Sequence, residues 1–241
     1  MKRSPQLCES KEQAIIFEAK KLDVGYGEIP VLHGITLHVK EGEMVALLGA
    51  NGAGKTTTLL ALAGELRPRR GLATFHRASA SDGLARRAQL GLGFVTEERS
   101  VFMELTCLEN LRLGRGSVEA ALEFMPELKA LLRRKAGLLS GGEQQMLSLA
   151  RVVASRPVAI MADELSLGLA PLIVDRLMAA LQQAARAGVA VLVVEQHVRK
   201  ALTVCDRAYV LRQGTMVLEG DSSSMLSRIN DIEDSYLSTP N

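Results

Sequence analysis

The sequence predicts an α/β fold with a mainly parallel sheet and a helical segment inserted in the middle of the chain. Three short apolar runs, at 44–48, 158–162 and 189–194, are typical of strands that are buried on both faces. Helical patterns separate these runs, and strands that alternate with helices favour a parallel sheet. The segment at about 98–156 is mostly helical in pattern. The 241 residues are enough for one large domain, or for a core with a small inserted subdomain.

The first part of the chain is expected to contain antiparallel strands, a glycine-rich loop and a helix. Residues 1 to about 13 are polar and predict a loose tail, and the pattern that follows is strand-like. Apolar and polar residues alternate over 35–40, as in a half-buried antiparallel strand. After the glycine-rich loop, a helix is expected from about Lys55 to Ala63, and Gly64 is suited to end it.

The rest of the chain predicts further helices and a hairpin. Leucines at helical spacing over 105–111 and apolar residues over 146–153 indicate two helices, of which the second ends before Pro157. A third helix is expected over 171–186. Short apolar runs on either side of Gln213-Gly214 indicate a hairpin.

The composition is that of an ordinary globular protein, with 47% apolar and 23% charged residues. A net charge of +2 is too small to favour nucleic acid as a partner, and short basic clusters are interpreted as solvated surface. Cys8, Cys107 and Cys205 lie far apart without metal spacing, so a reducing compartment is expected. No signal peptide is expected, because no apolar run follows Lys2 and Arg3, and no stretch approaches the roughly 20 apolar residues that cross a bilayer. Any role at a membrane is expected from the cytoplasmic side, through partners.

A phosphate-binding loop is predicted at 49–56, where the sequence reads Gly-Ala-Asn-Gly-Ala-Gly-Lys-Thr. It fits the pattern G-x-x-x-x-G-K-[ST], in which glycines let successive backbone N–H groups face the phosphates, and the following helix adds its positive end. A chance glycine-rich turn is the alternative, but the strand before the loop and the helix after it count against that alternative. The residues predicted to bind nucleotide here are Gly49, Asn51, Gly52, Ala53, Gly54, Lys55 (β- and γ-phosphates), Thr56 (through Mg²⁺) and Thr57 (α-phosphate).

Two adjacent carboxylates, Asp163 and Glu164, directly follow the apolar run at 158–162. They are expected at the carboxyl edge of the sheet, where ligands bind in open α/β folds. Adjacent side chains on an extended chain point opposite ways, so the two acids are predicted to have different roles. Asp163 is expected to hold Mg²⁺, and Glu164 to act as the general base for the water that attacks the γ-phosphate, with Lys55 as a further catalytic residue. The alternative is a pair of surface acids that cap the next helix.

The sequence Leu-Ser-Gly-Gly-Glu at 139–143 is expected to open a helix, with Ser140 and Glu143 as a capping box. The bare N–H groups at Gly141 and Gly142 make the turn a second anion site. Within one chain this site is redundant with the phosphate loop. We expect it to serve a nucleotide that a second subunit holds.

With these motifs in this order and at this approximate spacing, the chain resembles the ABC ATPase family over nearly its whole length. The resemblance implies a P-loop NTPase (RecA-like) core with an antiparallel β subdomain and an inserted α-helical subdomain. It implies one domain, with the core at 14–97 and 157–241 and the helical subdomain at 98–156. It also implies a head-to-tail dimer, in which each ATP lies between the phosphate loop of one subunit and the Ser140 turn of the other.

Further positions take their roles from this resemblance. Tyr26 matches the aromatic residue that stacks on adenine, although a turn aromatic packed on the core is the alternative. His197 matches the switch histidine that contacts the γ-phosphate, with a structural histidine as the alternative. Glu97 stands where most members carry a glutamine, and it can still bind Mg²⁺ or water. Leu165 replaces a usual proline, and Ala170 replaces a dimer-contact aspartate, which brings coupling of the two ATP sites through that aspartate into question.

Glu97, Ala170 and Val194-Glu195-Gln196 resemble one branch of the family, the ATPases of branched-chain amino acid importers and their urea and amide relatives. This resemblance implies an Mg-dependent ATPase that uses ATP and Mg²⁺ and is peripheral on the cytoplasmic face of the inner membrane. Its implied partners are membrane permeases, a second ABC ATPase subunit in a homo- or heterodimer and, indirectly, a solute receptor, but not nucleic acid. The alternatives are an exporter ATPase and a non-transport ABC ATPase that acts on nucleic acid or ribosomes.

Overall fold

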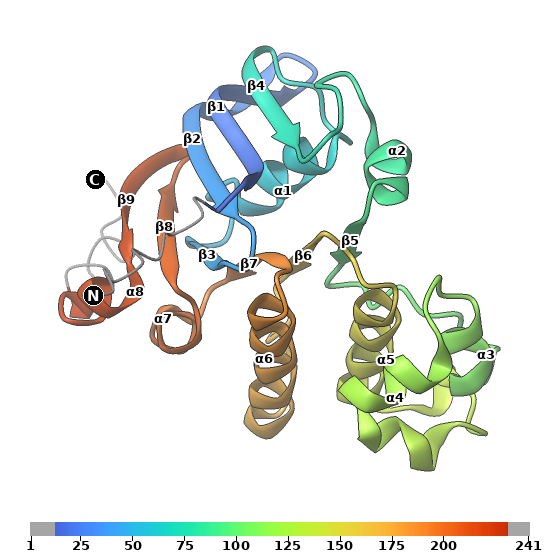
Figure 1. The fold of residues 1–241 in the computed structure, drawn as a ribbon. Helices are drawn as coiled ribbons and strands as arrows, with labels where there is room; N and C mark the ends of the chain where they lie inside the picture. The colour runs from blue at the N-terminus through green and yellow to red at the C-terminus, as the bar shows by residue number, and fades with distance from the viewer. Residues whose placement is uncertain (1–12, 231–241) are drawn as a thin grey trace, which may run out of the picture.

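The structure is a computed structural model that describes residues 13–230, arranged in two sheets with helices on both sides (Figure 1). The larger sheet has six strands in the order β5-β6-β7-β3-β8-β9, and the smaller has three in the order β2-β1-β4. In the larger sheet, β9 is antiparallel to β8 and the other pairs are parallel. The predicted α/β class with a mainly parallel sheet is confirmed. Residues 1–12 of the expected tail lie outside the described residues.

The centre of the larger sheet explains where the functional loops meet. Its strands β3, β6 and β7 are buried at every position, as expected for apolar runs with side chains on both faces. They are parallel neighbours, so their carboxyl ends lie at the same edge of the sheet. The six strands are β5 (Leu92–Val95), β6 (Ala159–Asp163), β7 (Ala190–Glu195), β3 (Met44–Leu48), β8 (Arg207–Arg212) and β9 (Thr215–Asp221).

The smaller, antiparallel sheet covers one face of the larger sheet together with the first helix (Figure 1). It consists of β1 (Ile15–Tyr26), β2 (Ile29–Lys40) and β4 (Arg70–Phe75). In β2, buried residues alternate with exposed ones, as predicted. Helix α1 (Lys55–Ala63) ends at Gly64, whose left-handed backbone (φ 81°) caps it as expected.

Helices α5, α6 and α7 cover the opposite face and share a second hydrophobic cluster with it. The smaller helices α3 and α4 pack on α5, away from the sheet (Figure 1). Among the described residues, no helix is long and apolar enough to cross a membrane. The remaining helices are α2 (Leu84–Gln89), α3 (Cys107–Arg112), α4 (Val118–Phe124), η1 (Pro126–Leu131), η2 (Ala136–Leu138), α5 (Gly141–Ala154), α6 (Pro171–Arg186), α7 (Val198–Val204) and α8 (Ser222–Leu226).

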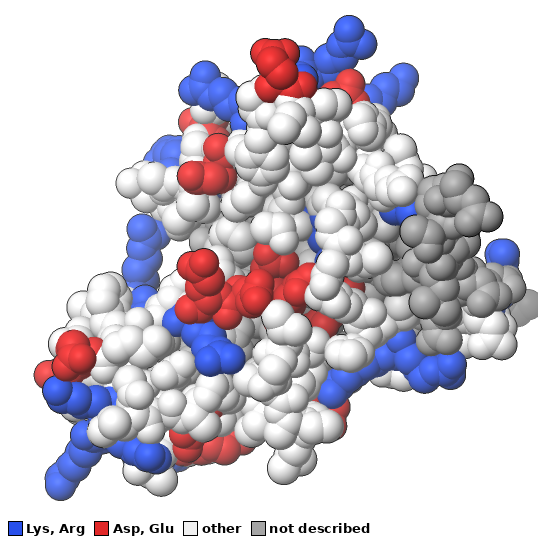
Figure 2. All heavy atoms as spheres, turned by 180° about the vertical axis from the view of Figure 1, so that it is seen from behind, with Lys and Arg blue, Asp and Glu red and all other residues white. Residues whose placement is uncertain are grey.

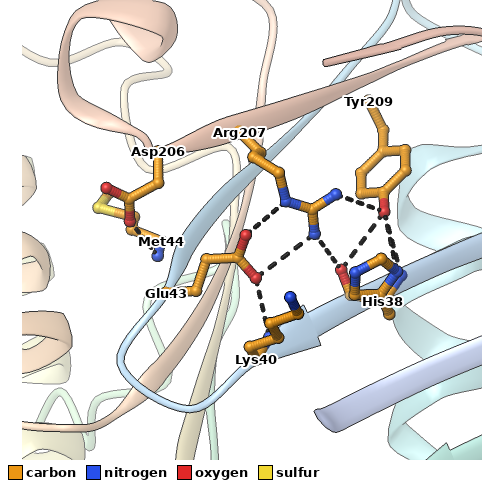
Figure 3. A network of polar contacts seen from close by, with 7 residues as sticks. All are labelled: His38, Lys40, Glu43, Met44, Asp206, Arg207 and Tyr209. Carbon is orange, nitrogen blue, oxygen red and sulfur yellow. Dashed lines mark hydrogen bonds and ion pairs between the residues drawn. The ribbon is translucent and has the colours of Figure 1, made fainter. Parts of the chain in front are cut away.

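A polar network ties the two sheets together at the end opposite the phosphate loop (Figure 3). The guanidinium of Arg207 pairs with Glu43 (Nε to Oε1, 2.5 Å) and donates to the Tyr209 hydroxyl and to the carbonyl oxygen of His38, both at 2.9 Å. Glu43 also accepts from the N–H of Lys40 at 2.9 Å. Burial and the charge of Arg207 lower the pKa of His38, so the neutral ring is favoured in the folded protein. We call His38, Glu43, Arg207 and Tyr209 the junction network.

Candidate functional site

The predicted phosphate loop lies between β3 and α1, at the carboxyl edge of the larger sheet. Gly52 and Gly54 have left-handed backbone conformations, with φ of 77° and 104°. A β-carbon on Gly54 would lie 2.6 Å from Leu32 Cδ2, and one on Gly49 would lie 2.6 Å from the carbonyl oxygen of Leu211. The loop is therefore pressed against β2 and β8, and only glycine fits at Gly49 and Gly54.

Lys55 begins α1 and reaches back across this loop. Its side chain is 4% exposed, and Nζ donates to the carbonyl oxygens of Gly49 and Ala50 at 2.8 and 3.1 Å. Nζ also forms an ion pair with Glu164 Oε1 at 3.2 Å. Because charge-assisted hydrogen bonds to phosphate are strong, a buried ammonium at the centre of the loop suits a triphosphate. The same atom links the loop to the acidic pair.

Asp163 ends β6 and is 7% exposed. Burial raises the pKa of its carboxyl and the charges of Glu164 and Glu97 add to the rise, whereas Thr56 and Lys55 lower it. Within residues 13–230, Asp163 Oδ1 is buried without a hydrogen-bond partner. A divalent cation would satisfy this oxygen and compensate the buried charge. Thr56 and Glu97, the other two residues predicted to bind metal, thus both act on the Asp163 carboxyl.

These groups fit a Mg²⁺ ion that is shared with a nucleotide. The described residues contain no cluster of three or more His, Cys, Asp or Glu side chains that could hold a metal without other ligands. Mg²⁺ is usually bound through one or two carboxylates together with waters and substrate phosphates. Asp163 and the hydroxyl of Thr56 provide a donor set of that kind.

Glu164 lies in a turn that is strained for a residue with a side chain. Its φ is 47°, a conformation that costs about 1–3 kcal/mol in such residues. Its N–H donates to the carbonyl oxygen of Val194 at 3.0 Å, and its carboxylate Oε2 accepts from Gln196 Nε2 at 2.7 Å. Because Oε1 pairs with Lys55, both carboxylate oxygens are held. Asp163 and Glu164 thus have different hydrogen-bond partners, although Glu164 lies after β6 and is not part of an extended chain as the sequence argument assumed.

The structure brings Gln196, and not His197, to Glu164. Gln196 is the first residue after β7. His197 is exposed, directly precedes α7 and lines a cleft between α6 and α7 with Ser166 and Leu169. Among the described residues its ring makes no hydrogen bond or ion pair. The apolar run in the sequence suggests a strand that ends at Val194, but β7 extends to Glu195. Gln196 is therefore the first residue after the strand, and its side chain reaches Glu164.

The Ser140 turn begins α5, and its predicted capping box is confirmed. The N–H of Glu143 donates to Ser140 Oγ at 3.3 Å, and the N–H of Ser140 donates to Glu143 Oε2 at 2.7 Å. Gly142 is buried, and a β-carbon on Gly141 would lie 2.8 Å from the guanidinium of Arg99, so a cation lies against this turn. In the described residues no hydrogen bond or ion pair joins the turn to the phosphate loop of its own chain.

Tyr26 ends β1 at the mouth of the phosphate loop. Its hydroxyl lies 3.4 Å from Thr57 Oγ1, and the residue is 47% exposed. The ring is therefore not packed in the core, which counts against the structural alternative. An exposed aromatic face beside a phosphate loop can stack on a base.

Charge is unevenly distributed over the face that Figure 2 shows. Acidic groups gather across its hollowed middle, and Lys and Arg lie mainly toward its edges (Figure 2). Nucleic-acid-binding surfaces carry their basic residues on one continuous patch or stripe. This face does not have that arrangement.

Known proteins resemble the chain in sequence and in fold. A model of the ABC transporter family matches residues 32–166. The chain is 37% identical over 230 residues to BraG of Pseudomonas aeruginosa, a high-affinity branched-chain amino acid transport ATP-binding protein, covering 90% of this chain and 97% of BraG. It is 32% identical over 220 residues to LptB of Escherichia coli, a lipopolysaccharide export system ATP-binding protein, covering 86% and 91%. The dimeric structure of MJ0796, a bacterial ABC transporter cassette, matches with a TM-score of 0.75 and 26% identity over 86% of this chain and 99% of that one.

Proposed function

The chain belongs to the ABC transporter family and is an ATP-binding ATPase coupled to transport, and from this premise we propose that it drives an importer of branched-chain amino acids or related small solutes. The identity to BraG over nearly the full length of both chains carries the proposal. An exporter is the second candidate, because LptB aligns over a similar length at lower identity. A role on nucleic acid is not favoured by a net charge of +2.

The phosphate loop and Lys55 hold the triphosphate in this proposal, and Tyr26 stacks on the adenine. Thr56 and Asp163 bind Mg²⁺ directly, and Glu97 lies close to the ion without being one of its direct ligands. When bound, Mg²⁺ neutralises charge on the β- and γ-phosphates. The unpaired Oδ1 of Asp163 is the feature of this chain that supports the metal site.

Hydrolysis is assigned to Glu164, which takes a proton from the attacking water. Lys55 and Gln196 hold its two carboxylate oxygens, so the base is oriented before the water arrives. The Gln196 side chain is a neutral amide, which donates to Glu164 without carrying a charge of its own. His197 keeps the role that the resemblance implies, as the histidine that contacts the γ-phosphate.

The second subunit is another copy of the chain or a related ABC ATPase. Its Ser140 turn would close over the nucleotide, where the α5 N-terminus adds a positive dipole end and Arg99 a positive charge. MJ0796, which forms a dimer, has the same fold. Ala170 is exposed at the start of α6 and offers no carboxylate to the partner.

The membrane permease is proposed to dock on the groove between β5 and the helical segment 98–156. A cleft of about 390 Å³ opens there, lined by residues of β5 and α5. Leu113 in its lining is 54% exposed. Phe102 is 55% exposed, and the centre of its ring lies 5.8 Å from the guanidinium of Arg151, which also lines the cleft. Apolar side chains exposed together suit a protein partner. The ATPase would then sit peripherally on the cytoplasmic face of the membrane.

The decisive experiment is to co-express the chain with permease candidates and to measure ATP-driven movement of labelled leucine and labelled urea in proteoliposomes. Import requires ATP-driven accumulation of the solute on the side of the membrane that carries the ATPase, and this accumulation should be lost with Glu164→Gln. Movement of a lipid or a solute away from the ATPase side would favour the exporter. Phe102→Glu should abolish co-purification with the permease and spare ATP binding, whereas Leu72→Glu, also at an exposed site but on β4, should do neither.

A further inference from the structure

Two consecutive residues at the end of β7 hold two residues of the loop that follows β6. Gln196 donates to Glu164, as described above. One position earlier, the carboxylate of Glu195 accepts from the hydroxyl of Ser166, with Oε2 and Oγ 2.6 Å apart. The 164–170 loop, which leads from Glu164 to α6, is therefore attached to β7 at two points.

Glu195, the last residue of β7, is unusually buried for an acidic residue. It is 2% exposed, it forms no ion pair within the described residues, and its Oε1 is buried there without a hydrogen-bond partner. Burial raises the pKa of its carboxyl, although the bond from Ser166 and the charge of His197 oppose the rise. A buried acid without a cation destabilises a fold, and an apolar residue of similar size would be more stable there. Core packing therefore does not explain why a carboxylate lies at this position.

The loop that Glu195 holds carries a strained residue. Glu164 has a φ of 47°, and such a conformation persists only where its surroundings hold it in place. The strained residue is held by contacts on both sides. The N–H of Glu164 donates to the carbonyl oxygen of Val194. After Glu164 in the chain, Leu165 is buried and the hydroxyl of Ser166 donates to Glu195. Ser166 is the last residue held in place before the exposed part of the loop begins at Leu167. Without its bond to Glu195, the part of the loop that is not held would begin at Ser166, directly after Leu165.

We propose that Glu195 is a positioning residue for ATP hydrolysis: by binding Ser166, it holds the 164–170 loop so that the Glu164 carboxylate stays in place against Gln196. It acts through Glu164 and touches no reacting atom. The proposal rests on the proposed function, in which Glu164 is the general base. Because misplacing a catalytic group by about 1 Å can reduce a rate by about 100-fold, a small shift of this loop has a large kinetic effect.

The test compares Glu195→Leu, Ser166→Ala and Glu195→Gln in the full-length chain. Glu195→Leu and Ser166→Ala should each lower kcat by on the order of 10- to 100-fold, while the Kd for ATP stays within about twofold. Glu195→Gln should keep kcat within about threefold, because its amide oxygen still accepts the Ser166 bond. The double variant that combines Glu195→Leu with Ser166→Ala should be no slower than the slower single variant, as expected for two residues in one contact.

Ser222→Ala is the control, since it removes a serine hydroxyl of lower exposure, 3%, at the start of α8 rather than in the 164–170 loop. It should leave kcat unchanged. If Glu195→Leu does not fold, the comparison of Ser166→Ala with Ser222→Ala decides. A wild-type kcat in Ser166→Ala, or an equal loss of ATP affinity and kcat in the Glu195 variants, overturns the positioning role.

Glu164→Gln, measured in parallel, separates the two proposals. If it turns over ATP at the wild-type rate, Glu164 is not the base, and the positioning role fails with it. If Glu164→Gln is inactive while Glu195→Leu and Ser166→Ala keep the wild-type kcat, the base assignment stands and the role of Glu195 alone is wrong.

Discussion

Among single residues, Lys55 connects most of the site, because its ammonium contacts the phosphate loop and Glu164 at the same time. Its side chain is almost fully buried. Its hydrogen-bond and ion-pair partners are two carbonyl oxygens and one carboxylate. The same position would let it exchange Glu164 for phosphate oxygens when a nucleotide binds.

Lys55→Ala should weaken ATP binding by at least about tenfold, since hydrogen bonds to charged groups contribute about 1.5–3 kcal/mol each. Isothermal titration with Mg-ATP measures the loss. Lys129→Ala, on the exposed surface of η1, is the control and should bind as the wild type does. Unchanged affinity in Lys55→Ala would rule out the loop as the triphosphate site.

Residues with fixed motif spacing could be predicted from the sequence, whereas contacts made across strands could not. Lys55, Asp163 and Glu164 follow buried strands at known offsets, and the structure places them together. Gln196 was missed because its role depends on where β7 ends relative to β6. Glu195 belongs to the stretch that resembles one branch of the family, but the sequence did not indicate its contact, since a glutamate at a strand end is ordinary until its partner Ser166 is known.

For secondary-structure elements, the junction network shows how the antiparallel sheet is attached to the core (Figure 3). Arg207 begins β8, Glu43 immediately precedes β3, and His38 lies in β2, so three strands meet in one set of polar contacts. The side chains of Arg207 and Glu43 are 20% and 11% exposed. A pair this buried is weakly screened by water, and removing one member leaves the other without its partner.

Glu43→Gln should therefore destabilise the protein by about 3 kcal/mol, because it leaves Arg207 partly buried without its counter-ion. Urea denaturation followed by circular dichroism measures the change. The control is Lys20→Gln, which removes an exposed pair with Glu18 and should change the free energy of unfolding by less than about 1 kcal/mol. Equal stability of the two variants would contradict the structural role of the junction network.

The elements that could be predicted from sequence are those with a continuous or periodic apolar pattern. The fully buried β3 and β6 and the helix α6 were predicted closely. β4 gave no signal, because it is an edge strand and its first three residues are exposed. The helix expected over 105–111 begins only at Cys107, because Thr106 caps it in a box with Glu109. A capping contact of this kind outweighs the leucine spacing that extends to Leu105.

At the scale of the whole molecule, the main feature is the position of the Ser140 turn, which in the described residues has no hydrogen bond or ion pair to the phosphate loop of the same chain. The Ser140 turn begins α5 on the face of the sheet opposite α1, within the helical part of the fold (Figure 1). A capped helix start with a nearby arginine is complete as local structure. Its proposed use as an anion site requires a second subunit.

Ser140→Arg should block ATP-driven dimer formation while leaving ATP binding by the monomer intact, because the long side chain would fill the space for the partner's nucleotide. Sedimentation velocity with ATP, in the Glu164→Gln background, measures the dimer. Ser117→Arg is the matched control, since Ser117 caps α4 in the same way and its loss costs about the same, ~1 kcal/mol. If both variants dimerise equally, the turn does not contribute to the partner's site.

The walls of the phosphate loop come from distant parts of the chain. Its carbonyl at Ala53 accepts from Gly214 in the β8–β9 turn, and Gly49 abuts Leu211, while the stretch that identifies the family stops at residue 166. A truncated protein ending there would keep the loop, the Ser140 turn and both acids, yet would lack β7 from the middle of its sheet. Such a fragment would carry the complete signature of a nucleotide-binding protein and have no folded place to receive the nucleotide.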